Sequence, residues 1–309
     1  MNGFTMAAIA ALSLAMTGCA TVPGAGSAAA DAEEAPARPF IERSLVLAPE
    51  SVGEFRLTEL NDYPDHPPSG AGLRYVHAEF PDVLVNLFVY PVGRADRDVA
   101  LVHGMTQLRE ELAAMSAQGR YQGLDYGEEV DFDLDTVGAD GQASPSDPVP
   151  ATGGGAGPDD VEAAFLAMAA KVEAAMDTSL GRRLSLSFTR EDGPMNSAAF
   201  MFYRGLYLYK GRISAPATAM PAENFDRFAN RAMALIVPVV EVRSTGGCAN
   251  LSVNVDPGAG SEEMQQQLMR GLVESNTRAK NENCAAALDT SVPEGHRSQS
   301  LVYPASMWR

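Results

Sequence analysis

The chain has 309 residues, and its formal net charge of -17 comes from 40 acidic against 23 basic side chains. Proteins that bind nucleic acid need a basic face to displace counterions, so this composition argues against a nucleic-acid partner. Hydrophobic residues make up 46% of the chain, enough to bury a sizeable core. Three cysteines are too few for a disulfide-dense scaffold or for a zinc site built from four thiolates.

An apolar segment near the start of the chain, residues 6–16, reads MAAIAALSLAM and is followed by Thr17, Gly18 and Cys19. The segment is too short to span a membrane, and its length suits the apolar region of a secretory signal peptide. A cysteine that follows small residues in this way resembles the lipobox of bacterial lipoproteins. The resemblance implies that residues 1–18 are a signal peptide and that Cys19 carries the lipid, palmitate included.

The resemblance also implies a location in the cell envelope, with the lipid anchor as the contact with the membrane. Ala20 stands where an aspartate would favour the inner membrane, so we expect an outer-membrane lipoprotein that faces the periplasm. Two features depart from the pattern: Met16 replaces the usual leucine, and residues 1–5 carry no basic side chain. An ordinary secreted protein and a buried apolar segment with a chance cysteine are the alternatives. Residues 19–39 are rich in Ala, Gly and Pro, which predicts a flexible tether.

Apolar periodicity predicts the elements of the first half of a folded domain. The expected elements are a strand near residue 54, strands at 72–80 and 83–91, a helix at 98–117 and a strand at 122–135. Pro81 and Asp82 are expected to join the second and third of these as a two-residue hairpin connection. The expected inner face of the helix comprises Val99, Val102, Met105, Leu108, Leu112 and Met115.

Six glycines and four prolines within residues 138–158 predict a long exposed loop. The second half then returns to helical and strand patterns. Its expected elements are a helix that begins at Asp159, strands at 182–190, 198–204 and 206–213, a helix that begins at Pro221 and ends at Pro238, a short strand at 249–255, a helix from Ser261 to about Lys280 and a C-terminal tail at 301–309.

These elements predict an α+β protein, with a mainly antiparallel sheet covered by helices in one domain over residues 40–300. Two lobes divided near residue 150 are the alternative. The order of two strand–helix pairs is similar to that of PsbP-like and DcrB-like proteins. In the first pair, Val89, Tyr90 and Pro91 end the strand that precedes the helix at 98–117.

The second pair is the strand 206–213, which reads LYLYKGRI, and the following helix with Phe225 and Phe228. This resemblance implies an α/β/α sandwich. It implies a family that includes bacterial lipoproteins with no established chemistry, and binding roles elsewhere. It carries over no site residue, because it rests on the order of elements and not on a diagnostic motif.

Cys248 and Cys284 remain once Cys19 is assigned to the lipid. An exported protein meets an oxidising compartment, so a disulfide between the two cysteines is expected. Two free buried thiols are the alternative. A catalytic thiol would need a nearby base, and the local sequence supplies none.

Carboxylates recur at alternate positions in Asp131, Asp133 and Asp135, as they do in calcium-binding loops. Phe132 and Leu134 lie between them, which is typical of a strand with one solvated acidic face. We therefore predict no metal site here. The four histidines, His66, His77, His103 and His296, are scattered and form no metal-binding spacing.

Motifs that carry catalysis are absent from the sequence: there is no nucleophile elbow, phosphate loop or dinucleotide fingerprint. The aromatic cluster Phe200, Phe202, Tyr203, Tyr207 and Tyr209 suits a core better than a ligand site. We therefore predict no catalytic residue and no cofactor. The expected function is a non-catalytic envelope lipoprotein that binds a partner protein or an envelope ligand. The alternative is a hydrolase whose site is assembled from distant residues, His77 or His103 among them.

Overall fold

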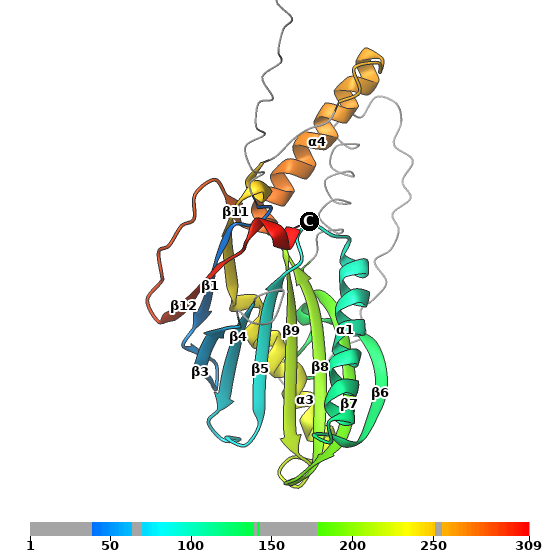
Figure 1. Cartoon of the computed structure of the whole chain (residues 1–309), viewed down its shortest axis with the longest axis vertical. Coiled ribbons are helices and arrows are strands. Elements are labelled where there is room, and N and C mark those ends of the chain that lie inside the picture. Colours follow the sequence, from blue (N-terminus) through cyan, green and yellow to red (C-terminus); the bar gives the residue numbers. More distant parts are fainter. Residues whose placement is uncertain (1–38, 64–69, 139–140, 143–177, 251–254, 309) are drawn as a thin grey trace, which may run out of the picture. The chain divides into compact units, whose positions relative to one another are not determined.

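The computed structural model describes residues 39–63, 70–138, 141–142, 178–250 and 255–308 (Figure 1). The residues from Arg38 to Arg309 cluster as one compact unit. Within the described ranges the predicted α+β class is confirmed, with three α-helices, an eight-stranded antiparallel sheet and a four-stranded mixed sheet. The expected signal peptide, most of the tether and the Gly/Pro-rich loop, and the helix expected from Asp159 lie outside these ranges.

The large sheet is antiparallel throughout, and each pair of neighbouring strands is joined by backbone hydrogen bonds. Its strands in spatial order are β2 (Ser51–Val52), β3 (Phe55–Asp62), β4 (Ala71–His77), β5 (Leu84–Pro91), β9 (Tyr207–Pro216), β8 (Gly193–Arg204), β7 (Leu180–Arg190) and β6 (Gln122–Asp133). The edge strand β6 is acidic and carries two irregularities of register, both of which discourage pairing with another chain.

The small sheet joins the two ends of the domain. Its strands in order are β11 (Cys284–Ala285), β10 (Glu241–Thr245), β1 (Arg43–Pro49) and β12 (His296–Val302). The prediction of a strand at 249–255 is wrong for the residues that the structure describes. Gly247–Ala249 form a 3₁₀ helix, η3, and the strand of this region is β10, which lies earlier in the chain.

The expected C-terminal tail is also corrected, because it is packed into the domain. Leu301 lies in β12 and Tyr303 is buried. Trp308, in the 3₁₀ helix η4 (Ala305–Trp308), donates from Nε1 to the carbonyl oxygen of Ile41 at 2.9 Å. Aromatic side chains of this size bury enough apolar surface to hold a chain end in place.

Helices lie on both faces of the large sheet (Figure 1). Helix α1 (Arg97–Ala117) packs on β7, β8 and β9, and helix α3 (Ala222–Ile236) packs on the opposite face together with the small sheet. Strand β8 shows why both faces are covered: Phe200 and Phe202 point to the α3 side, whereas Ala199 and Met201 point to the α1 side. The aromatic cluster of the sequence is therefore mostly core.

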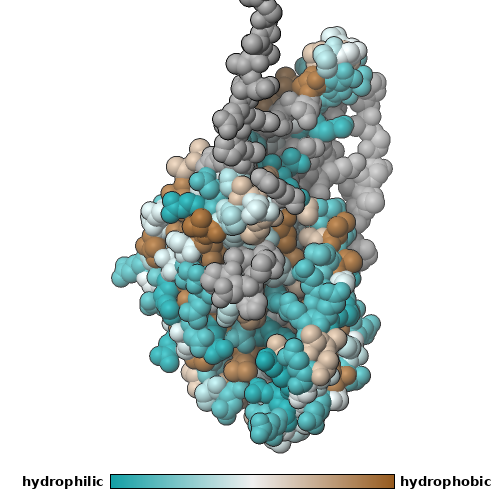
Figure 2. Space-filling view, viewed as in Figure 1, coloured by the Kyte–Doolittle hydropathy of each residue, from teal (hydrophilic) through white to brown (hydrophobic). Residues whose placement is uncertain are grey.

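Helix α4 (Ser261–Glu282) exposes four large apolar side chains in its first turns. These exposed residues are Met264, Leu268, Met269 and Leu272. Elsewhere, Figure 2 shows a largely hydrophilic surface with scattered hydrophobic residues on the face in view. Within the described ranges, no helix is both long and apolar enough to cross a membrane.

The connection between β4 and β5 is longer than predicted. Residues 78–83 join the strands, and the amide of Val83 donates to the carbonyl oxygen of Phe80 at 3.1 Å. A two-residue hairpin connection needs positive φ at its first residue, and the proline ring fixes φ near -65°. Pro81 therefore excludes the tight turn.

The buried face of α1 is rotated from the predicted one. Met105, Leu108 and Leu112 are buried as expected, but Val99 and Val102 are exposed, and their places are taken by Ala100, Leu101 and Gly104. A Cβ atom at Gly104 would lie 2.9 Å from the sulfur of Met201 and 3.1 Å from Leu208. The glycine therefore lets the helix approach the sheet on that side.

This rotation predicts that truncating two adjacent side chains lowers the free energy of unfolding by very different amounts. Leu101→Ala should lower the free energy of unfolding by about 2–5 kcal/mol, because Leu101 is 2% exposed and its removal leaves a cavity. Val102→Ala should change it by less than about 0.5 kcal/mol, because Val102 is 59% exposed. Urea denaturation of both variants measures the two values, and a larger loss for Val102→Ala would contradict this packing.

Candidate functional site

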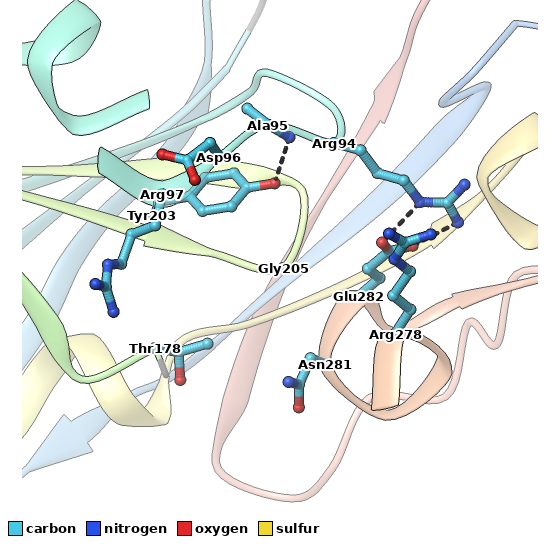
Figure 3. Close-up of a pocket in the computed structure, with 10 residues that line it drawn as sticks. All are labelled: Arg94, Ala95, Asp96, Arg97, Thr178, Tyr203, Gly205, Arg278, Asn281 and Glu282. Atoms are coloured by element: carbon cyan, nitrogen blue, oxygen red, sulfur yellow. Dashed lines mark hydrogen bonds and ion pairs between the residues drawn. The ribbon is translucent and has the colours of Figure 1, made fainter. Parts of the chain in front are cut away.

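Two adjoining cavities of about 440 and 410 Å³ lie where three elements meet: the β8–β9 turn, the segment leading into α1 and the last turn of α4. Figure 3 shows the lining of the larger one. Thr178, Gly205, Asn281 and Glu282 line both cavities. We refer to the pair of cavities as the double cavity.

The floor of the double cavity is the tight turn between β8 and β9. Gly205 has φ of +63°, a conformation that residues with a Cβ atom rarely adopt. A Cβ atom at this position would lie 2.9 Å from the carbonyl oxygen of Asn281. Glycine is therefore needed both for the turn and for the close approach of α4.

One wall is the segment that leads into α1. The hydroxyl of Tyr203 donates to the carbonyl oxygen of Gly93 at 2.9 Å and accepts from the amide of Ala95 at 3.1 Å. Burial raises the pKa of Tyr203, so its hydroxyl stays protonated and keeps donating. Asp96 caps the helix, because its Oδ1 accepts from the amide of Val99 at 3.1 Å.

The opposite wall is the end of α4, which is tied to the first wall by an ion pair. Arg94 donates from Nε and Nη2 to the two carboxylate oxygens of Glu282, at 2.7 and 2.8 Å (Figure 3). Nη2 also donates to the carbonyl oxygen of Cys248 at 2.8 Å. The hydrogen bond that Arg94 donates to Glu282 raises the pKa of Arg94, and the carboxylate side chain is only 9% exposed.

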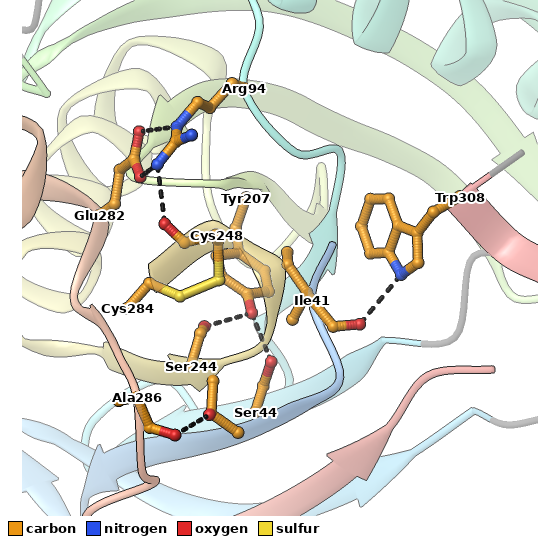
Figure 4. The surroundings of a disulfide bond; sticks show 11 residues. Ile41, Ser44, Arg94, Tyr207, Ser244, Cys248, Glu282, Cys284, Ala286 and Trp308 are labelled. Carbon is orange, nitrogen blue, oxygen red and sulfur yellow. Dashed lines mark hydrogen bonds and ion pairs between the residues drawn. A yellow bond between two sulfur atoms is a disulfide. The ribbon is translucent and has the colours of Figure 1, made fainter. Parts of the chain in front are cut away.

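A disulfide fixes the chain directly after that wall. Cys248 in η3 is joined to Cys284 in β11, two residues beyond Glu282 (Figure 4). Between them, Asn283 adopts a left-handed conformation and donates to the carbonyl oxygen of Val242 at 3.1 Å. In the loop-entropy model, a bridge that closes a 36-residue separation contributes roughly 4 kcal/mol to stability.

A buried hydroxyl network lies beneath the disulfide (Figure 4). The hydroxyl of Tyr207 is hydrogen-bonded to Ser44 and, at 2.6 Å, to Ser244. Burial raises the pKa of Tyr207 to about 12, so this hydroxyl is neutral at physiological pH. Tyr207 lines the smaller cavity but carries no charge into it, and its network is structural.

Four arginines place positive charge in the lining of the double cavity: Arg94, Arg97, Arg204 and Arg278. They come from the α1 segment, from β8 and from α4, and no spacing in the sequence connects them. Nothing in the sequence distinguishes these four from the other residues among its 23 lysines and arginines. Sequence reasoning therefore missed the site.

The histidines considered in the sequence are not brought together. His77 lies among the rings of Phe55, Phe80 and Phe228, and its Nδ1 accepts from the amide of Glu79 at 3.1 Å. His103 is exposed on α1, and His296 begins β12. None of these three described histidines lines the double cavity; His66 lies outside the described ranges.

The acidic run on β6 has structural partners. Asp131 forms an ion pair with Arg182 at 2.8 Å, and Asp133 accepts from the amide of Asp135 at 3.0 Å. Strand β6 ends at Asp133 and Leu134 begins the 3₁₀ helix η1 (Leu134–Thr136), so the predicted strand is two residues too long. In the ranges the structure covers, no cluster of three or more His, Cys, Asp or Glu could hold a metal ion.

The double cavity is suited to binding. Its described lining holds no histidine, serine or cysteine, and its ionisable groups are arginines, carboxylates and tyrosines. Such a lining can hold a polar molecule through charge-assisted hydrogen bonds. Comparison with known proteins adds nothing to this geometry, because no family model and no curated protein matches the chain.

The ion pair between Arg94 and Glu282 predicts a larger loss of stability than an exposed ion pair does when its carboxylate is removed. Glu282→Gln should lower the free energy of unfolding by about 2–4 kcal/mol, because it leaves a partly buried guanidinium without its anion. Glu59→Gln is the matched control, since it removes the exposed pair with Arg74 and should cost less than about 1 kcal/mol. Chemical denaturation measures both losses, and equal losses would show that the Arg94–Glu282 pair does not hold the site together.

Proposed function

We propose that this protein is a non-catalytic lipoprotein of the bacterial cell envelope that binds a small envelope ligand in the double cavity. The observation that carries the proposal is the lining itself: two adjoining cavities of about 440 and 410 Å³ with four arginines. Cavities of this size match those that hold small organic molecules. A lid or a catalytic set is not needed for such a role.

The sequence supports the location. The apolar segment followed by Cys19 resembles a lipobox, and a lipid anchor with two or three acyl chains gives stable membrane attachment. The Cys248–Cys284 disulfide suits a compartment outside the cytoplasm. We propose the outer membrane, with the domain in the periplasm, because Ala20 follows the cysteine.

Binding is favoured over hydrolysis by the state of the groups around the double cavity. A hydrolase places a nucleophile beside a base. Tyr203 and Tyr207 have raised pKa values, and the carboxylate of Glu282 accepts two hydrogen bonds from Arg94. His77, one of the two histidine candidates of the sequence, lies instead among aromatic rings and accepts from a backbone amide.

Removal of the lipidated residue tests the anchor. In Cys19→Ala the protein should move from the membrane pellet to the soluble fraction, because no acyl chain can be attached. Cell fractionation with immunoblotting reads the result, and wild type is the control. A variant that stays in the pellet would show that something other than the lipid holds the protein there.

Blocking the double cavity tests the binding role. Asn281 is exposed and lines both cavities, so Asn281→Trp should place an indole in them. Mass spectrometry of protein captured from native membranes should find a stoichiometric companion with wild type and with Glu110→Trp, an exposed position on α1. The companion should be lost with Asn281→Trp.

Two results would contradict this role. One is a companion, whether a small molecule or a protein, that is retained in full by Asn281→Trp. The other is the absence of any companion together with esterase or peptidase turnover that disappears in His77→Ala. An unchanged unfolding temperature in Asn281→Trp shows that the variant is folded, so that lost binding can be attributed to the double cavity.

A further inference from the structure

We propose that the double cavity binds a small molecule that carries oxyanion groups, carboxylate or phosphate, through Arg97 of α1 in the larger cavity and Arg204 of β8 in the smaller one. The inference rests on the proposed function and names the chemical class of its ligand. It follows from the partners of each charged group around the double cavity. Positive charge remains there after every local carboxylate has been assigned a partner.

The carboxylates of the lining are already engaged. Asp96 caps α1 through the amide of Val99, and Glu282 accepts from Arg94. Glu241, in the smaller cavity, accepts from Nε of Arg243 at 2.8 Å and from Asn283 at 2.9 Å. None of these three acids is hydrogen-bonded to Arg97 or Arg204 within the part of the chain that the structure describes.

Arg97 presents a donor without an acceptor. Its Nη1 is buried and has no hydrogen-bond partner among the described residues. Its Nε lies 3.2 Å from Asp98, whose side chain is largely exposed. Figure 3 shows the guanidinium on the side of the larger cavity opposite Arg278 and Glu282. A buried donor of a charged group is costly to leave unpaired, and an oxyanion in the cavity would pair it.

Arg204 presents a cation that has no ion pair among the described residues, although the charge of Asp135 acts on it from a greater distance. It lines the smaller cavity, is partly buried, and lies over the ring of Tyr209 with 5.7 Å between the guanidinium carbon and the ring centroid. No ion pair or hydrogen bond joins its guanidinium to another residue of the described ranges. Burial lowers the pKa of Arg204, which shows that desolvation outweighs the surrounding negative charge.

The remaining lining fits a small polar molecule that carries the oxyanion. Thr178 and Asn281 are common to both cavities, and Asn283 lines the smaller one. Hydroxyl and amide groups of this kind can hydrogen-bond the uncharged oxygens of a ligand. Guanidinium groups form two parallel hydrogen bonds to a carboxylate or a phosphate, so arginine suits both. The expected ligand class is therefore a small organic acid or phosphate ester, free or as a lipid headgroup.

Titration calorimetry on the full chain in detergent, with inorganic phosphate and with citrate as probes, tests the inference. Wild type should bind at least one probe at a single site, and more weakly as salt is added. Arg97→Gln and Arg204→Gln should each weaken binding about tenfold, through the loss of a charge-assisted hydrogen bond. Arg190→Gln is the matched control: this arginine lies at the far end of β7, beside Asp192, and its loss should change affinity less than about twofold.

A vesicle flotation experiment distinguishes an oxyanion on a lipid headgroup from one on a free ligand. Cys19→Ala, which lacks the anchor, is mixed with vesicles of phosphatidylglycerol or of phosphatidylcholine. Flotation with phosphatidylglycerol alone that is lost in Arg97→Gln and Arg204→Gln would support the inference and identify a headgroup. Binding of phosphate or citrate without flotation would support it and identify a free ligand.

The inference is overturned if neither probe and neither vesicle binds in a way that depends on Arg97 and Arg204, or if Arg190→Gln weakens binding as much as they do. This outcome is separate from failure of the proposed function. A captured companion that Asn281→Trp loses, but that Arg97→Gln and Arg204→Gln retain, would leave the binding role intact and reject the oxyanion.

Discussion

The ion pair between Arg94 and Glu282 is the interaction on which the site depends. It joins the segment before α1 to the last turn of α4, two elements 188 residues apart in sequence. Nearly full burial of the carboxylate makes the pair costly to break, and the Cys248–Cys284 bridge holds the chain just beyond it. Asn283, which follows α4, adds hydrogen bonds to Glu241 and to the carbonyl oxygen of Val242, and these links together keep the end of α4 beside Gly205.

The ion pair also explains the charge that remains. Arg94 uses its donors on Glu282 and on the carbonyl oxygen of Cys248, so the one buried carboxylate of the double cavity is neutralised. Among the described residues, Arg97 then pairs through Nε with the exposed Asp98 and leaves its buried Nη1 without an acceptor, and Arg204 has no ion pair. A folded protein rarely keeps buried charged donors unpaired, and where it does, a ligand or water commonly pairs them. The structure thereby links a stabilising contact to a proposed binding role.

Much of the large sheet was predictable, because strands with one covered face alternate in the sequence. Strands β5 and β7 were predicted within two residues of their observed bounds for this reason. Strand β1 was missed because Ser44 to Ala48 are all buried, and a strand covered on both faces has no alternation to detect. The buried face of α1 was predicted incorrectly in its first turns. The residue that lies against the sheet there is Gly104, which has no side chain to count as apolar.

By itself, the sequence determined the α+β class, the acidic character and the pair of cysteines available for a bridge, because composition and short-range periodicity record these properties directly. It also provided the expectation of a lipid anchor at Cys19. Only the tertiary structure decided that Arg94, Arg97, Arg204 and Arg278 share one double cavity, since they lie on three elements that are far apart in the chain. Which charges are paired and which are left over is a property of distances between such elements, and no local pattern of residues encodes it.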